Sequence, residues 1–269
     1  MGRIRSRYGT GIAGWVVLPG FGVCSLLPLA MTFGYAFIHT AFEPRFVGLE
    51  NFRYLALNRY FLLGSINLLR IGGIILLIGM TLILVTGFLL DQHPRMMRTG
   101  IAILVLPLLI PSVSAVTIWK AVFRTNTLLE NSDAQVALIT LFLWKNAGIG
   151  GALFAVALRR LPSELRDAAA LDGAGVLRTF LFVLLPNAIG FLFLALVLLV
   201  MFFLRIFKES YLLFGQYPSR DVYLLQNYMN NQYLKMNFQY VAASAILIIV
   251  AALVIYGFCF LVIRKKEAK

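Results

Sequence analysis

Few residues of this chain could do chemistry, and the first group lies inside an apolar stretch. Trp144, Lys145 and Asn146 follow one another within residues 134–158. A charge at that depth in an apolar helix is costly, so Lys145 should face a wet cavity or a polar partner. Ammonium and amide groups can bond hydroxyls, and aromatic rings can pack on the apolar faces of a polyhydroxylated solute. The alternative is a structural ion pair or hydrogen bond between Lys145 and another segment or subunit.

The second group is a charged, alanine-rich island, "RDAAALDGAGVLRTFLFVLLP", at residues 166–186. Pro162 and Ser163 supply a helix start just before it, and the alanines at 168–170 are strong helix formers. Gly173 can take the left-handed conformation that ends a helix. A short helix with a small alanine face suits close approach by another protein. The alternative is an ordinary amphipathic loop at the lipid interface.

Motifs of the common catalytic chemistries are missing from the sequence. No lysine follows a glycine, which excludes a P-loop, and there is no G-x-S-x-G or H-E-x-x-H motif. Cys24 and Cys259 lie in apolar segments, where we expect small buried side chains rather than a disulfide or metal site. We therefore expect no catalytic activity, no bound cofactor and no metal in this chain.

The elements that must position these residues are membrane helices. Of the 269 residues, 61% are hydrophobic and 13% charged, which no soluble domain of this size could bury. A bilayer core of about 30 Å requires roughly 20 apolar residues in a helix. Six windows satisfy this: 13–38, 66–90, 100–123, 134–158, 180–204 and 240–263. The sequence predicts one all-α polytopic membrane domain over 1–269, with Pro107 and Pro111 able to kink the third span.

Basic residues predict the orientation of these spans. The N-terminus, the 91–99 turn, the 159–179 loop and the C-terminal "RKKEAK" hold 13 of the 24 Lys and Arg, against eight in the opposite loops. Both termini and the 162–186 loop should therefore be cytoplasmic. This bias accounts for the net charge of +13 without nucleic acid, and the basic clusters should meet anionic membrane lipid.

The island resembles the EAA loop of binding-protein-dependent ABC importer permeases, E-A-A-x-x-x-G, nine residues, then I-x-L-P. The matching positions are Asp167, Ala168, Ala169, Gly173, Val183, Leu185 and Pro186, and Asp172 and Ala174 complete a D-G-A form. Asp for Glu and Val for Ile are conservative departures. In that family the loop is a coupling helix that docks on a cytoplasmic ATPase. The resemblance implies that role for Asp167, Ala168, Ala169, Asp172, Gly173 and Ala174.

Other stretches resemble the sugar-importing branch of maltose and glycerol-phosphate type permeases. They are "FVGLENFRYL", "INLLRIGGIIL", "VLPLLIPSVSAVTIWKAVF" and "LWKNAGIGGALFAVALRRLP", whereas the loop at 124–133 is shorter than usual. The resemblance implies substrate contacts in the fourth and fifth spans. The matching residues are Lys145, Asn146, Ile149, Leu199, Phe202, Phe203 and Ile206. Together with Arg205 and Lys208, Lys145 would favour an anionic sugar.

The resemblance implies a six-span permease subunit in a bacterial inner membrane. Its expected partners are a second, homologous permease, a cytoplasmic ATPase dimer that uses ATP and Mg, and an extracytoplasmic binding protein that delivers a sugar or oligosaccharide. Three alternatives stay open: a stand-alone secondary carrier or channel, a non-catalytic membrane scaffold, and an ABC permease for a non-sugar solute. The carrier would have to work without an acidic residue at mid-membrane or an evident inverted repeat.

Overall fold

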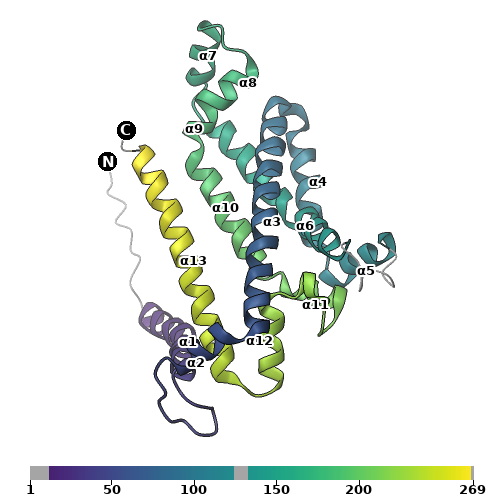
Figure 1. The fold of residues 1–269 in the computed structure, drawn as a ribbon. Coiled ribbons are helices and arrows are strands. Elements are labelled where there is room, and N and C mark those ends of the chain that lie inside the picture. Colours follow the sequence, from purple (N-terminus) through teal and green to yellow (C-terminus); the bar gives the residue numbers. More distant parts are fainter. Residues whose placement is uncertain (1–11, 124–132, 268–269) are drawn as a thin grey trace. The chain divides into compact units, whose positions relative to one another are not determined.

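The computed structural model describes residues 12–123 and 133–267, and these residues form helices joined by short turns (Figure 1). No strand forms within them, apart from an isolated bridge between Ile38 and Phe46. In chain order the elements are α1 (Ile12–Ala36), α2 (Glu50–Leu57), α3 (Arg59–Gln92), η1 (Pro94–Met96), α4 (Met97–Leu109), α5 (Ser112–Val122), α6 (Asp133–Arg160), α7 (Glu164–Leu171), α8 (Val176–Thr179), η2 (Phe180–Leu184), α9 (Leu185–Asn187), α10 (Ile189–Phe203), α11 (Phe207–Phe214), η3 (Arg220–Val222), α12 (Leu225–Leu234) and α13 (Phe238–Glu267).

All six predicted apolar windows fall on helices. Three helices are long and apolar enough to cross a membrane: Arg59–Gln92, Ala134–Arg160 and Phe238–Gly257. Two more crossings are formed if each bent pair, Pro94–Leu109 with Ser112–Val122 and Val176–Asn187 with Ile189–Phe203, is one span. The first window coincides with α1, whose described apolar part is shorter. By length and composition the structure thus supports up to five spans among the described residues, one fewer than predicted.

A proline lies at or just before each of the two bends. The third predicted span turns by 93° where Ile110 and Pro111 leave the helical conformation between α4 and α5. A proline disfavours the helical conformation in the residue before it, so the predicted kink is confirmed. The fifth span turns by 76° at Ala188, two residues after Pro186. The π-helical turn η2 precedes this bend, and the Asn187 side-chain amide donates to the carbonyl of Val183 at 2.7 Å.

The described residues divide into two compact units, one of residues 12–58 and 229–252 and the other of residues 59–123, 133–228 and 253–267. In the first unit, the Asn51 side chain donates to the carbonyls of Ala36 and Ile38 at 2.9 and 2.8 Å and so fixes the turn after α1. The ring of Tyr54 stacks on that of Tyr240 with centroids 4.2 Å apart.

The second unit is built around α6. Inside the structure, 72% of the apolar window of α6 is buried, against 22% for α3. Helices α3, α4 and α10 all pack on it. The approach is close because the contacting positions are glycines: a Cβ at Gly148 of α6 would collide with the carbonyl of Leu104 of α4, and one at Gly87 of α3 would meet the Phe154 ring of α6 at 2.5 Å.

Several sequence expectations concern residues outside this description. The N-terminal basic arm, most of the 124–133 loop and the side chains of the C-terminal basic run and of Cys259 are among them. Cys24 is described, and it is exposed on α1. The expectation that it is buried is therefore wrong within this chain, because the face of α1 that carries it has no covering helix among the described residues.

Candidate functional site

Helix α7 begins without help from a side chain. Its first turn is closed by the backbone amides of Arg166 and Asp167, which donate to the carbonyl of Ser163 at 2.8 and 3.0 Å, while the Ser163 hydroxyl makes no capping bond. Glu164 and Asp167 occupy this first turn, where the helix dipole stabilises negative charge. The predicted position of the helix start is confirmed, whereas the side-chain cap expected of Ser163 is not formed.

The end of α7 is a Schellman motif centred on Gly173. The amide of Ala174 donates to the carbonyl of Ala169 at 2.9 Å, and that of Gly173 donates to Ala170 at 3.0 Å. Gly173 has φ +70°, the left-handed conformation that the sequence predicted. This turn reverses the chain between α7 and α8, so that the two short helices form one exposed end (Figure 1).

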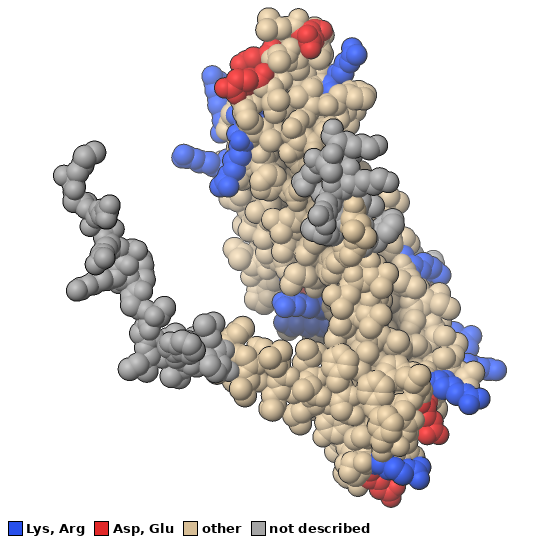
Figure 2. Space-filling model, turned by 90° about the vertical axis from the view of Figure 1, so that its left-hand side faces the viewer, with Lys and Arg blue, Asp and Glu red and all other residues tan. Residues whose placement is uncertain are grey.

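That end carries apolar side chains that nothing in the described chain covers. The Leu171 side chain is 90% exposed, and Val176 and Leu177 beyond the turn are 58% and 60% exposed. Figure 2 shows acidic side chains gathered at the same end, with basic ones beside and below them. An apolar knob with a charged rim is typical of a protein-binding surface.

The six predicted coupling residues divide between this surface and its support. Asp167, Ala168, Asp172 and Gly173 are exposed, Ala174 is half-buried and Ala169 is buried. Ala169 is the one described residue of α7 that is fully buried, so this helix is held by little apolar contact.

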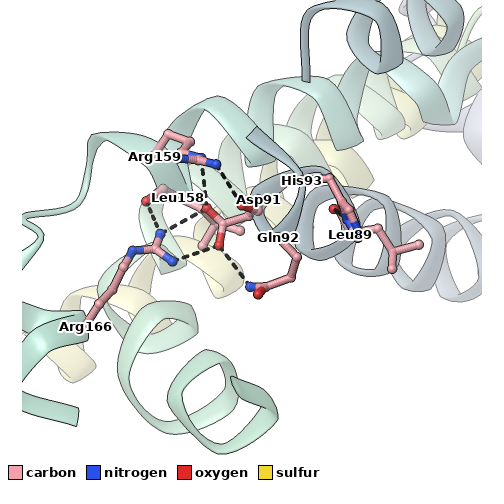
Figure 3. A network of polar contacts seen from close by, with 7 residues as sticks. All are labelled: Leu89, Asp91, Gln92, His93, Leu158, Arg159 and Arg166. Atoms are coloured by element: carbon pink, nitrogen blue, oxygen red, sulfur yellow. Dashed lines mark hydrogen bonds and ion pairs between the residues drawn. The ribbon is translucent and has the colours of Figure 1, made fainter. Parts of the chain in front are cut away.

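A polar network at the base of α7 supplies what apolar packing does not (Figure 3). The carboxylate of Asp91, at the end of α3, is fully buried and accepts two bonds from the Arg166 guanidinium of α7, at 2.9 and 3.0 Å. Arg166 also donates to the carbonyl of Leu158 at 3.0 Å. Arg159 of α6 approaches the same carboxylate at 3.5 Å and donates to the Asp91 carbonyl at 2.9 Å. We call Asp91, Arg159 and Arg166 the Asp91 clamp.

Sequence reasoning missed this clamp. Arg159 and Arg166 counted only as basic loop residues, and Asp91 only as an acid at the end of a span. A signal was present, because Asp91 follows a long apolar run and faces a loop rich in arginine. An acid in that place has reason to pair with one of those arginines.

The Lys145 side chain lies in a second buried network. Its Nζ is 3.1 Å from Oε1 of Glu209 on α11 and donates to the Ser112 hydroxyl of α5 at 2.6 Å. Ser112 in turn donates to the same Glu209 oxygen at 2.8 Å. Only 10% of the Lys145 side chain and 13% of the Glu209 side chain are exposed. The polar partner that the sequence required is thus Glu209, within the same chain.

The other predicted pathway residues have protein contacts of their own in this structure. The Asn146 side-chain amide donates to the carbonyl of Phe142 in its own helix at 2.9 Å, and Ile149 is half-buried. Leu199, Phe203 and Ile206 are at most 5% exposed and belong to the hydrophobic core, while Phe202 packs partly buried against it. In this arrangement the core residues of α10 contact protein, and reaching a solute would require α10 to move.

The sequence matches the family described as "Binding-protein-dependent transport system inner membrane component" over residues 75–267. One similar protein is the sn-glycerol-3-phosphate transport system permease protein UgpA of Pectobacterium atrosepticum, 27% identical over 66% of this chain and 63% of that protein. Another is the probable ABC transporter permease protein YurN of Bacillus subtilis, 28% identical over 51% of this chain and 48% of its own length. The aligned part spans less than two thirds of these relatives.

Two solved structures share the fold. A chain of a bacterial ABC transporter involved in import of the acidic polysaccharide alginate superposes with a TM-score of 0.81 at 19% identity, covering 94% of each chain. A chain of the bacterial alginate ABC transporter in complex with its alginate pentasaccharide-bound periplasmic protein gives 0.74 at 18% identity over 93% of each chain. At this identity, the likeness establishes the architecture of the helices.

Proposed function

Because this chain belongs to the family of binding-protein-dependent transport system inner membrane components, we propose that it is a permease subunit of an ATP-driven importer. It forms a translocation path with a second, similar permease. An extracytoplasmic binding protein delivers a sugar or oligosaccharide to this path, and two ATPase subunits drive the transport. The observation that carries the proposal is the exposed end formed by α7 and α8, with Leu171 presented to solvent on a helix that Gly173 terminates.

ATP hydrolysis belongs to the partner ATPases, which use ATP and Mg, because this sequence has no nucleotide-binding motif. Both termini and the α7–α8 end lie in the cytoplasm of a bacterium, in keeping with the distribution of basic residues. Closure of the ATPase dimer displaces α7, and the displacement opens the path alternately to the two sides. The residues that make this contact are Asp167, Ala168, Ala169, Asp172, Gly173 and Ala174.

The proposed solute, a sugar or oligosaccharide, follows from the names of the similar proteins. One relative is named for sn-glycerol 3-phosphate and a structural neighbour for the acidic polysaccharide alginate. Lys145 could bind an anionic sugar only if the solute displaced Glu209, its present partner. We keep the pathway assignment as a proposal for Lys145, Asn146, Ile149, Leu199, Phe202, Phe203 and Ile206. In this proposal α10 shifts during the transport cycle to uncover its core-facing residues.

Co-purification tests the proposed function. The chain would be tagged at its C-terminus, extracted from its own membrane in mild detergent, and its companions identified and counted by mass spectrometry. We expect one homologous permease and two copies of an ATPase, with ATP hydrolysis by the purified complex. Recovery of the chain alone, or as a homo-oligomer without ATPase activity, would contradict the proposal and favour a stand-alone carrier or channel.

A further inference from the structure

The Asp91 clamp joins three helices at one carboxylate. Asp91 ends α3, Arg159 ends α6, and Arg166 lies in α7, the helix proposed above to dock on the ATPase. The Arg166 guanidinium alone makes three contacts, two with the Asp91 carboxylate and one with the Leu158 carbonyl of α6. Figure 3 shows the side chains of both arginines pointing toward Asp91.

The geometry of these contacts fixes orientation as well as distance. A guanidinium that binds a carboxylate through two parallel N–H groups holds both planes in register, which a single hydrogen bond cannot do. The Asp91 side chain is fully buried, so water does not compete for its oxygens. Removing one partner would leave a buried charge partly unpaired, which resists separation of α7 from α3.

The remaining contacts of α7 are weak by comparison. Among its eight residues only the methyl group of Ala169 is buried. The covalent connections lead into α6 through residues 161–163 and into α8 through residues 172–175, and neither leads to α3. Among the described residues, a displacement of α7 therefore reaches α3 through one polar contact, the one with Asp91.

We infer that Asp91 and Arg166 are positioning residues that make α7 and the end of α3 move as one body, so that displacement of the docking helix is carried directly into the longest described helix of the second unit. Arg159 holds the same carboxylate against α6. This inference rests on the proposed function, because it assigns the clamp to the transmission of the ATPase stroke.

The test follows the distance between α7 and α3 in the assembled complex. Spin labels would be attached to cysteines replacing Leu89, at the exposed side of α3, and Glu164, at the start of α7, with Cys24 and Cys259 changed to serine. Electron paramagnetic resonance would compare the nucleotide-free complex with the complex trapped by ATP and vanadate. We expect one narrow distance distribution, the same in both states.

In the variant Arg166→Gln we expect the narrow distribution to be lost, or to shift between the two states, while ATP hydrolysis stays within about twofold of the unmodified complex. Arg166→Lys keeps the charge but not the paired contact and should give an intermediate width. If Arg166→Gln fails to insert into the membrane, the distance distribution of Arg166→Lys serves as the test instead. The double variant Asp91→Asn with Arg166→Gln should give a distance distribution no broader than that of the broader single variant. This is expected of two groups that act through one contact.

Arg160→Gln is the matched control. Arg160 is exposed next to Arg159 and forms no ion pair within the part of the chain that the structure describes, so its loss removes the same charge without touching the clamp. It should behave like the unmodified protein.

Two results would overturn the inference. One is an α3–α7 distance that already changes with nucleotide in the unmodified complex, and the other is an unchanged narrow distribution in Arg166→Gln. If both Arg166 variants lost complex assembly and ATP hydrolysis together, the Asp91 clamp would have a structural role only, which would also contradict the inference. If the unmodified chain does not co-purify with an ATPase, the result is different, because it contradicts the proposed function itself.

Discussion

Lys145 illustrates how this protein keeps a charged side chain inside an apolar helix. Its partners Ser112 and Glu209 come from segments 33 and 64 residues away in the sequence. The sequence predicted that Lys145 needs a polar partner or a wet cavity, because an isolated charge is costly there. It could not predict which group, since the pairing depends on how α5 and α11 fold back onto α6.

At this scale the structural and transport roles of Lys145 can be separated by experiment. Lys145→Met would leave Glu209 buried without its cation, which should destabilise the chain by about 3–5 kcal/mol. The double variant Lys145→Met with Glu209→Gln should recover much of that loss, measured as thermal unfolding in detergent. If Lys145 also serves the pathway, the stable double variant will still fail to take up an acidic sugar. Unchanged uptake would assign Lys145 to structure alone.

At the scale of elements, α7 was the most predictable part of the candidate site. Its start, its alanine run and the left-handed Gly173 are local features, and all three are found in the structure. What lies beneath α7 was not predictable, because the Asp91 clamp joins residues 75 positions apart. The bend at Ala188 was also missed, since Pro186 alone did not show how far the chain would turn.

Gly173→Leu tests the turn that ends α7. The left-handed conformation should cost leucine about 1–2 kcal/mol, and the Schellman motif should be disturbed. A Cβ there would meet no atom within 4 Å, so any effect comes from the backbone and the exposed surface rather than from a clash. We expect the complex to insert and hydrolyse ATP while uptake per ATP falls.

Gly175→Leu is the control for this experiment. Gly175 lies in the same turn and also has open space around its Cβ position, but its φ of −69° is ordinary for leucine. It should transport nearly as well as the unmodified protein. Normal coupling in Gly173→Leu, or equal defects in both variants, would contradict the role given to the left-handed turn.

For the whole molecule, composition alone predicted a polytopic helical membrane protein, and the family match and the fold support that prediction. The windows did not reveal which helix is central. α6 is the least apolar of the three long spans, and yet it is the most buried. A helix surrounded by other helices can hold polar groups such as Lys145 that lipid would exclude, so hydropathy and burial diverge here.

Topology is the prediction that belongs to this scale. Single cysteines in place of Ser163, before α7, and of the exposed Tyr217, after α11, should react with a membrane-impermeant maleimide from opposite sides of the membrane. Ser163→Cys should label only in inverted vesicles and Tyr217→Cys only in intact cells or spheroplasts. Labelling of both from one side would contradict the orientation proposed from the basic residues.

The exposed knob of α7 and α8 also bears on the life of the chain before assembly. A newly inserted copy without the proposed ATPase would present Leu171, Val176 and Leu177, all exposed here, to the aqueous phase. Exposed apolar side chains of this kind are what chaperones and proteases recognise in unfinished proteins. The surface proposed to dock an ATPase would then also be a degradation signal until it is covered, and unpaired copies should be short-lived. The cell would thereby match the number of permeases to the number of motors.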